Sequence, residues 1–307
     1  MKIMINRKII EGPWGGGNLF VKGVLKELKS QGHNVYFDFV EDLDYIFIIN
    51  PMPSEYGYDI NQILQYKSLF PAVKLVHRIN ECEKRKGLNN GLDHILTETA
   101  KRSDIVIFIS DWLKQYFYKK GYTGKSHVIY NGCDSKYFNF KEALDKPSNT
   151  NQVHLVTHHW SNHIFKGYDF YQELDEILTD NKWKFTFIGR YHKNFSPKNI
   201  NLIPPKSGKE LADELKKANI YITASKWEPC GMHHIEGAAC GLPVLYHVDG
   251  GGINEGCKRY GEGFKSIDTF KNSLNKIVKN YENYISSIKS HDLTMEKCCK
   301  DYINLLK

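Results

Sequence analysis

The sequence lacks several features that would place it in well-defined classes of protein. No apolar run approaches the ~18–20 residues that a membrane-spanning helix needs, and the N-terminus lacks the continuous apolar core of a signal peptide. The seven cysteines are irregularly spaced, with Cys298 and Cys299 adjacent and no C-x2-C pair. We therefore expect a cytoplasmic protein with reduced thiols, without a transmembrane helix, a disulfide framework or a zinc ribbon.

A dense block of basic residues is also missing. The 42 Lys and Arg residues against 35 Asp and Glu residues give a net charge of +7, spread along the chain. This modest excess suits an anionic ligand such as a nucleotide, or weak attraction to an anionic membrane surface. It does not resemble a nucleic-acid binder, because no recognised motif accompanies it. Peripheral membrane contact therefore stays open, and nucleic acid is not an expected partner.

The 307 residues instead show a repeated strand–helix pattern. The continuous apolar run 105–109 indicates burial on both faces of a strand, and hence a parallel sheet. The expected strands are 2–5, 35–39, 45–49, 74–77, 105–110, 127–130, 154–157, 184–188, 220–223 and 243–246. The expected helices are 19–30, 168–178, 208–217 and 232–240, with a turn at 12–17 and only helices from 266 to 307.

A polar stretch rich in Pro, Ser and Asn, residues 141–152, is the expected domain boundary. We expect an α/β chain with two Rossmann-like parallel-sheet domains, 1–145 and 146–290, that face each other across a cleft. A C-terminal helix, 291–307, follows them. In such sheets, ligands bind at the carboxyl ends of the strands.

The most informative segment is SKWEPCGMHHIEGAACGLPV, residues 225–244. Glu228 and Glu236 are separated by seven residues, and a Pro-Cys-Gly turn leads into a helix expected to start near Met232. Unpaired backbone amides at a helix N-terminus favour phosphate. A carboxylate one turn inside the helix can accept hydrogen bonds from a vicinal diol such as ribose. A strand, a turn and a helix with two incidental glutamates are the plainer interpretation.

This string resembles the E-x7-E signature of retaining glycosyltransferases, particularly glycosyltransferase family 4, which has the GT-B fold. Lys166-Gly167 lies where that family has a lysine on the donor diphosphate. The Asn131-Gly132 turn and the glycine segments 15–17 and 250–252 also resemble the family. The resemblance runs from the first strand to about Gly263, and it is tighter in the second half.

The resemblance implies retaining transfer of a sugar from a UDP- or GDP-sugar to a glycan, lipid-linked or protein-linked acceptor, without a metal or cofactor. The first domain would lie on the acceptor side, the second would bind the donor, and the C-terminal helix would pack back on the first. Catalytic roles fall on His77, Lys166 and Glu228, and acceptor contacts on Asn80 and Glu81. The expected donor-binding residues are Gly16, Gly17, Lys166, Arg190, Gly231, Met232, His233 and Glu236.

The chain departs from the family where Gly-Arg is usual, because it has His158-His159-Trp160 there, and Arg190 is the expected substitute. Two histidine groups permit a metal interpretation, but zinc needs three or four converging ligands, and hydrogen bonding to phosphate or sugar is preferred. The first histidine group is His158, His159 and His163, and the second is Cys230, His233 and His234.

Other functions remain as alternatives. A catalytically degenerate nucleotide-sugar-binding protein stays open because the Gly-Arg pair is missing. A nucleotide-sugar epimerase of the same fold should lack the E-x7-E string, and a phosphorylase of this fold needs a much longer chain. A dehydrogenase fails because G-x-G-x-x-G is absent.

Overall fold

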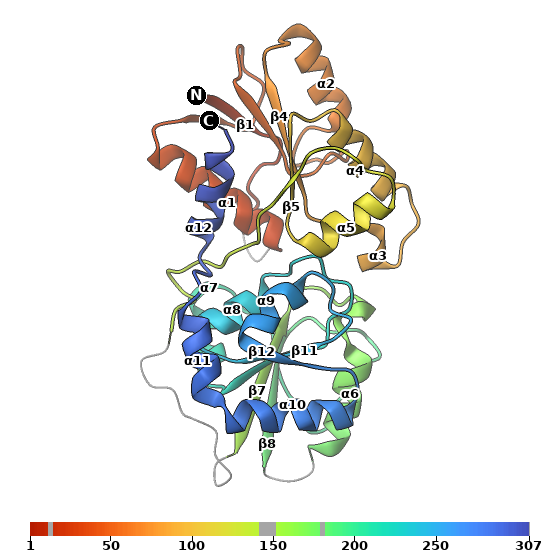
Figure 1. Cartoon of the computed structure of the whole chain (residues 1–307), viewed down its shortest axis with the longest axis vertical. Coiled ribbons are helices and arrows are strands. Elements are labelled where there is room, and N and C mark those ends of the chain that lie inside the picture. Colours follow the sequence, from red (N-terminus) through yellow and green to blue (C-terminus); the bar gives the residue numbers. More distant parts are fainter. Residues whose placement is uncertain (12–14, 141–151, 179–181, 307) are drawn as a thin grey trace. The chain divides into compact units, whose positions relative to one another are not determined.

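The computed structural model describes residues 1–11, 15–140, 152–178 and 182–306. The chain divides into two compact units. The colours of Figure 1 follow the sequence through them, from the N-terminus to the C-terminus. Unit 1 comprises Met1–Asn131 and Met295–Lys307, and unit 2 comprises Gly132–Thr294. The expected domain boundary at 141–152 lies outside the described residues, apart from Gln152.

Unit 1 is built on a parallel sheet with six strands among the described residues. Its strands, in sheet order, are β2 (Asn34–Tyr36), β1 (Lys2–Ile5), β3 (Tyr45–Ile48), β4 (Lys74–Ile79), β5 (Ile105–Phe108) and β6 (His127–Val128). All four residues of β3 are buried, as expected for a strand covered on both faces. The strand order reverses between β1 and β3, so the crossover helices lie on both sides of the sheet.

Helices connect the strands of unit 1, and the C-terminal helix joins them. They are α1 (Gly16–Ser30), α2 (Ile60–Leu69), α3 (Glu83–Lys86), α4 (Leu92–Lys101), α5 (Asp111–Lys119) and α12 (Met295–Asn304). Helix α12 packs against α1, with the rings of Phe20 and Tyr302 4.7 Å apart. The Tyr45 hydroxyl donates a hydrogen bond to the Leu306 carbonyl at 2.7 Å. This last turn of the chain is therefore part of the unit 1 core.

Unit 2 contains a second parallel sheet, again with six strands among the described residues. Its strands, in sheet order, are β9 (Asn201–Ile203), β8 (Trp183–Gly189), β7 (Val153–His159), β10 (Ile220–Thr223), β11 (Val244–His247) and β12 (Gly261–Phe264). Numbered within the unit, this is the order 3-2-1-4-5-6 of a dinucleotide-binding sheet. The order reverses between β7 and β10, and the carboxyl ends of these two strands are where such a sheet binds ligands.

The unit 2 helices form two groups on the sheet. Helix α10 contacts α6 and the strands β11 and β12, whereas α8 contacts α9, β7 and β10. The described helices of unit 2 are η1 (Ile164–Lys166, a 3-10 turn), α6 (Tyr168–Ile177), α7 (Gly208–Leu215), α8 (His233–Ala239), α9 (Ile253–Tyr260), α10 (Ile267–Lys279) and α11 (Tyr281–Lys289). A capping box starts α10, where Ser266 and Thr269 satisfy each other's backbone amides.

The expected α/β chain with two parallel sheets is confirmed. Most expected strands and helices are present, with ends shifted by up to three residues. The predicted end of the turn at 12–17 is wrong, because Gly16 and Gly17 are the first two residues of α1. The elements β9, α9 and β12 were not expected. None of the described helices combines the length and apolar character that crossing a membrane requires.

Candidate active site

The candidate site lies at the carboxyl ends of β7 and β10, where the strand order of unit 2 reverses. His158 and His159 are the last residues of β7, and Thr223 is the last of β10. The loop after β10 leads to Glu228, and the loop after β7 leads to Lys166. The topology therefore brings the lysine and the first glutamate of the motif to one edge of the sheet.

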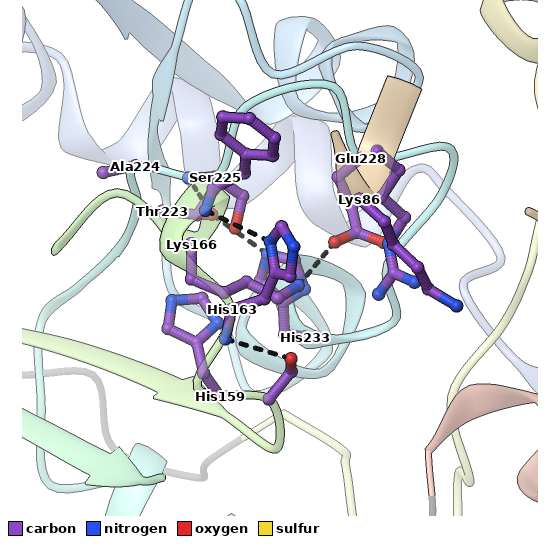
Figure 2. Close-up of polar contacts among 12 residues, drawn as sticks. Lys86, His159, His163, Lys166, Thr223, Ala224, Ser225, Glu228 and His233 are labelled. Atoms are coloured by element: carbon purple, nitrogen blue, oxygen red, sulfur yellow. Dashed lines mark hydrogen bonds and ion pairs between the residues drawn. The ribbon is translucent and has the colours of Figure 1, made fainter. Parts of the chain in front are cut away.

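Lys166 and Glu228 form a buried ion pair, drawn in Figure 2. The Lys166 Nζ lies 2.5 Å from Glu228 Oε2, and the side chains are only 9% and 8% exposed. Gly167 has a φ of +85°, and a Cβ at this position would collide with the Ala224 carbonyl. A glycine is therefore needed for the lysine loop to approach the end of β10. Each buried charge compensates the other, since either one alone would be poorly solvated.

The backbone around Glu228 is fixed by a neighbouring glycine turn. Trp227 has a positive φ of +55°, which is unusual for a residue other than glycine. The Trp227 and Glu228 amides donate to the carbonyls of Asp249 and Gly250, each at 2.9 Å. A Cβ at Gly251 would lie 3.0 Å from the Trp227 backbone, and its φ is +79°. This turn thus holds Glu228 from the backbone side.

Glu236 belongs to the short helix α8 and is bonded to the end of β7. Its Oε2 lies 2.7 Å from His158 Nε2, and both residues are buried. The helix begins at His233 with Met232 as N-cap, close to the expected start. A Cβ on Gly237 would collide with the Tyr221 ring, so this glycine permits close packing of α8 on β10.

Three buried histidines near these carboxylates are kept neutral. Burial, followed by the charge of Lys166, holds the pKa values of His159 and His233 well below their ordinary value. Burial lowers the pKa of His234 to about 3. One ring nitrogen of each bonds a hydroxyl group, as in the 3.0 Å contact of His233 Nε2 with Thr223 Oγ1 in Figure 2. Among the described residues, no three His, Cys, Asp or Glu side chains are arranged to hold a metal.

A small hollow adjoins the histidine end of β7. Its lining residues are His158, His159, Trp160, Ile188, Gly189, Pro205 and Lys206. Arg190 follows this edge, and its amide donates to the His159 carbonyl at 2.9 Å. The Arg190 residue is exposed, so its side chain does not share the buried position of Lys166.

The remaining predicted site residues belong to unit 1. His77, on β4, is fully buried, and burial lowers its pKa to about 3. Among the described residues, neither ring nitrogen of His77 has a hydrogen-bond partner. Asn80 and Glu81 follow β4, and Glu81 Oε2 lies 2.6 Å from Arg85 Nη1. Gly17, in the first turn of α1, has open space around its Cβ position.

Sequence reasoning missed the bond between His158 and Glu236. It treated His158 only as a departure from the Gly-Arg pair and as one member of a histidine group. The partners are 78 positions apart, so no local pattern connects them. One signal in the sequence could have indicated a role for His158, because it directly follows the strand expected at 154–157, the first strand after the expected domain boundary.

Comparison with known proteins places these features in a family. Residues 161–290 match the profile of the family described as glycosyl transferases group 1. They include Lys166, Glu228 and Glu236. Unit 2 carries a glycosyl transferases group 1 domain. No contact described above conflicts with this assignment.

Curated relatives extend the similarity beyond the group 1 domain. A probable sucrose-phosphate synthase of Thermosipho melanesiensis is 35% identical over 113 residues, which cover 33% of this chain. The matched stretch spans only 26% of that relative. An uncharacterized glycosyltransferase of Methanocaldococcus jannaschii is 27% identical over 280 residues, covering 77% of this chain and 76% of the relative.

Solved structures show that the fold of the whole chain is shared. HepE of Anabaena, in complex with UDP-glucose, matches 100% of this chain and 99% of its own, with a TM-score of 0.70 at 14% identity. At that identity the likeness establishes the fold alone. The two parallel sheets, together with the group 1 domain, are those of GT-B glycosyltransferases.

Proposed function

We propose that this protein is a retaining glycosyltransferase that moves a sugar from a nucleotide-diphosphate sugar to a carbohydrate-containing acceptor. The observation that carries the proposal is the buried pair of Lys166 and Glu228 at the point where the strand order reverses in the group 1 domain. Uracil is the first donor base to test, because HepE, a protein of the same fold, was solved in complex with UDP-glucose.

The leaving group sets the chemical demand on the site. When the bond to the sugar breaks, negative charge builds up on the β-phosphate of a nucleoside diphosphate. A cation and hydrogen-bond donors at that position stabilise this charge. We assign the cation to Lys166, which exchanges its contact with Glu228 for one with the diphosphate. Backbone amides at Gly231, Met232 and His233 add donors.

The two glutamates would divide the rest of the donor between them. Glu236 accepts hydrogen bonds from the ribose hydroxyls. Glu228, released from Lys166, faces the sugar, where it contacts hydroxyls or stabilises oxocarbenium-like charge. Arg190 is the proposed second cation for the diphosphate. This reaction needs no metal in our account, because Lys166 and the amides supply the electrophilic groups.

Residues of unit 1 complete the proposal. We assign His77 to the transferred sugar, Asn80 and Glu81 to the acceptor, and Gly16 and Gly17 to donor binding. Glu81 would have to share its carboxylate with Arg85, its 2.6 Å partner. The acceptor is a glycan, free or linked to lipid or protein.

Incubation with UDP-glucose and GDP-sugars, with and without EDTA, tests this function. We expect slow release of nucleoside diphosphate that EDTA does not suppress. Proton NMR of the first glucose released to water should show the α anomer, because the donor is α-linked and the configuration is retained. Release of the β anomer would contradict retention. Binding without release would favour the degenerate binding protein, and interconversion of the donor would favour an epimerase.

A further inference from the structure

We infer that His158 and Tyr221 form a hydrogen-bond relay that orients Glu236 for the ribose of the donor. This inference rests on the proposed function, in which Glu236 is the ribose-binding carboxylate. His158 lies on β7, Tyr221 on β10 and Glu236 on α8, so the relay joins three elements of unit 2. All three residues are buried, with relative exposures of 3%, 0% and 4%.

The contacts of His158 fix where its proton lies. The His158 amide donates to the Tyr221 hydroxyl at 3.2 Å, and that hydroxyl lies 3.2 Å from His158 Nδ1. The hydroxyl also lies 3.4 Å from the His158 carbonyl, a longer contact. Burial raises the pKa of Tyr221 well above its ordinary value, so the hydroxyl keeps its proton and can donate to Nδ1. The ring proton is then on Nε2.

A proton on Nε2 suits the contact with the glutamate. Glu236 Oε2 lies 2.7 Å from this nitrogen and, as a carboxylate, can only accept. The Nε2–H group of the ring therefore donates to Glu236. Each carboxylate oxygen has two lone-pair sites, so Oε2 can accept from the ring and still accept from a hydroxyl.

Packing prevents the relay from rotating away. A Cβ at Gly237, the residue after Glu236, would collide with the Tyr221 ring. The ring is therefore held against the first turns of α8. A carboxylate on a free side chain would lose rotational freedom when it binds a diol, whereas one held by His158 has already lost it. His158 is thus a positioning residue for donor binding.

Two variants with the same amide chemistry separate this role from simple packing. His158→Gln places an amide nitrogen near the position of Nε2 and keeps the donor to Glu236. His158→Asn is shorter, reaches only the position of Nδ1 and loses that donor. Calorimetric titration with UDP-glucose should give a dissociation constant within about threefold of the unaltered protein for Gln. We expect weakening of about tenfold or more for Asn.

The outcomes distinguish this inference from the proposed function. Failure of the unaltered protein to bind either UDP-glucose or a GDP-sugar overturns the proposed function, and this inference with it. Binding with equal affinity in the Gln and Asn variants overturns this inference alone. A general defect of the fold would lower the melting temperature and kcat of the Asn variant, whereas a positioning role raises the donor KM with kcat nearly kept.

A second measurement holds even where His158→Asn fails to fold. Nitrogen-15 NMR of the histidine rings in the ligand-free protein should show a proton on Nε2 of His158, the nitrogen that faces Glu236. Tyr221→Phe, which removes the hydroxyl, should redistribute the proton between the two nitrogens and weaken UDP-glucose binding. A His158 ring protonated at Nδ1 alone in the unaltered protein would contradict the relay.

Discussion

The two units place polar residues at the ends of their strands in different ways. In unit 2, the buried Lys166 is paired with Glu228, and Glu236 is bonded to His158. In unit 1, the buried Arg78 at the end of β4 has no carboxylate partner among the described residues. Its Nη2 donates to Asn131 Oδ1 at 2.9 Å, and the guanidinium lies 4.2 Å from the centre of the Phe20 ring.

This difference concerns the buried cations, because unit 2 pairs its lysine with a carboxylate whereas unit 1 holds Arg78 without one. The unit 2 carboxylates have partners that fix their positions, and a fixed dipole or charge costs no reorganisation during a reaction. Unit 1 stabilises its cation by an aromatic face and one amide, and burial alone keeps His77 neutral. We therefore expect substitutions at the paired residues of unit 2 to affect donor chemistry more than stability.

The largest expected effect belongs to Lys166→Ala. Removal of the cation leaves the leaving group without its main stabilising charge, so kcat should fall about 10²–10³-fold. The measurement is the initial rate of UDP release from UDP-glucose. Lys209→Ala is the matched control, since Lys209 pairs with Asp213 on the exposed surface of the same unit.

The same variant also separates catalysis from folding. Breaking a buried pair costs about 3–5 kcal/mol, because Glu228 is left charged and buried. The double variant Lys166→Met with Glu228→Gln should recover much of this stability and none of the activity. Turnover that persists in Lys166→Ala while the melting temperature drops would make Lys166 a structural residue.

Acid should destabilise unit 2 more than unit 1. Three buried histidines of unit 2 and His77 of unit 1 have pKa values lowered in the folded state, so the unfolded chain binds more protons below its histidine pKa of about 6.5. Their stabilisation is complete above about pH 6.5 and is lost as pH falls. Each such histidine lowers the free energy of unfolding by about 1.4 kcal/mol per pH unit below that point.

Urea unfolding between pH 5 and 8 measures this slope. His234→Asn should flatten it, because it removes one group whose pKa is lowered to about 3. His94→Asn should leave the slope unchanged, since His94 is exposed on α4. A slope that is the same in both variants would contradict the assignment of His234 as a neutral buried histidine.

A smaller effect on stability should distinguish alanine substitutions at two glycines that have positive φ angles. Gly251→Ala strains a φ of +79° and brings a Cβ within 3.0 Å of the Trp227 backbone. Gly121→Ala in unit 1 strains a φ of +93° but meets no atom within 4 Å. We expect a loss of about 1–2 kcal/mol for Gly121→Ala and a larger loss for Gly251→Ala.

Donor affinity gives the second readout of this pair. Gly251→Ala should weaken binding of UDP-glucose, because the turn around Gly251 holds the backbone of Glu228. Gly121→Ala should not change it. Equal loss of stability with unchanged affinity in both variants would mean that the Gly251 turn does not position Glu228.

The sequence predicts the local parts of this structure well. The strands 2–5 and 220–223 have the predicted bounds, because continuous apolar runs flanked by polar residues mark buried parallel strands. It does not predict β9 or β12, which lie at the two edges of the unit 2 sheet. Strand β12 contains two glycines, and a Cβ at Gly261 would collide with the Val244 carbonyl. Close approach to β11, not β propensity, therefore explains this strand.

The candidate site also has a part that the local sequence predicts and a part that depends on the strand order. Glu228, Glu236 and the turn between them were visible as a contiguous string. The partners Lys166 and His158 come from the loop and strand before it, and they meet the string only through the strand order of unit 2. The positive φ of Trp227 could not be predicted from the sequence, because it depends on the glycine turn at 249–251.

The most direct test of the account is calorimetric titration of UDP-glucose into the unaltered protein, Glu236→Gln and Glu173→Gln. Glu173 is an exposed residue of α6 and serves as the matched control. We predict saturable binding by the unaltered protein and by Glu173→Gln, and weakening of about tenfold or more in Glu236→Gln, because the amide replaces one acceptor oxygen by a donor and leaves only a neutral acceptor for the ribose. Equal affinity in all three proteins would contradict the claim that unit 2 binds the donor through Glu236.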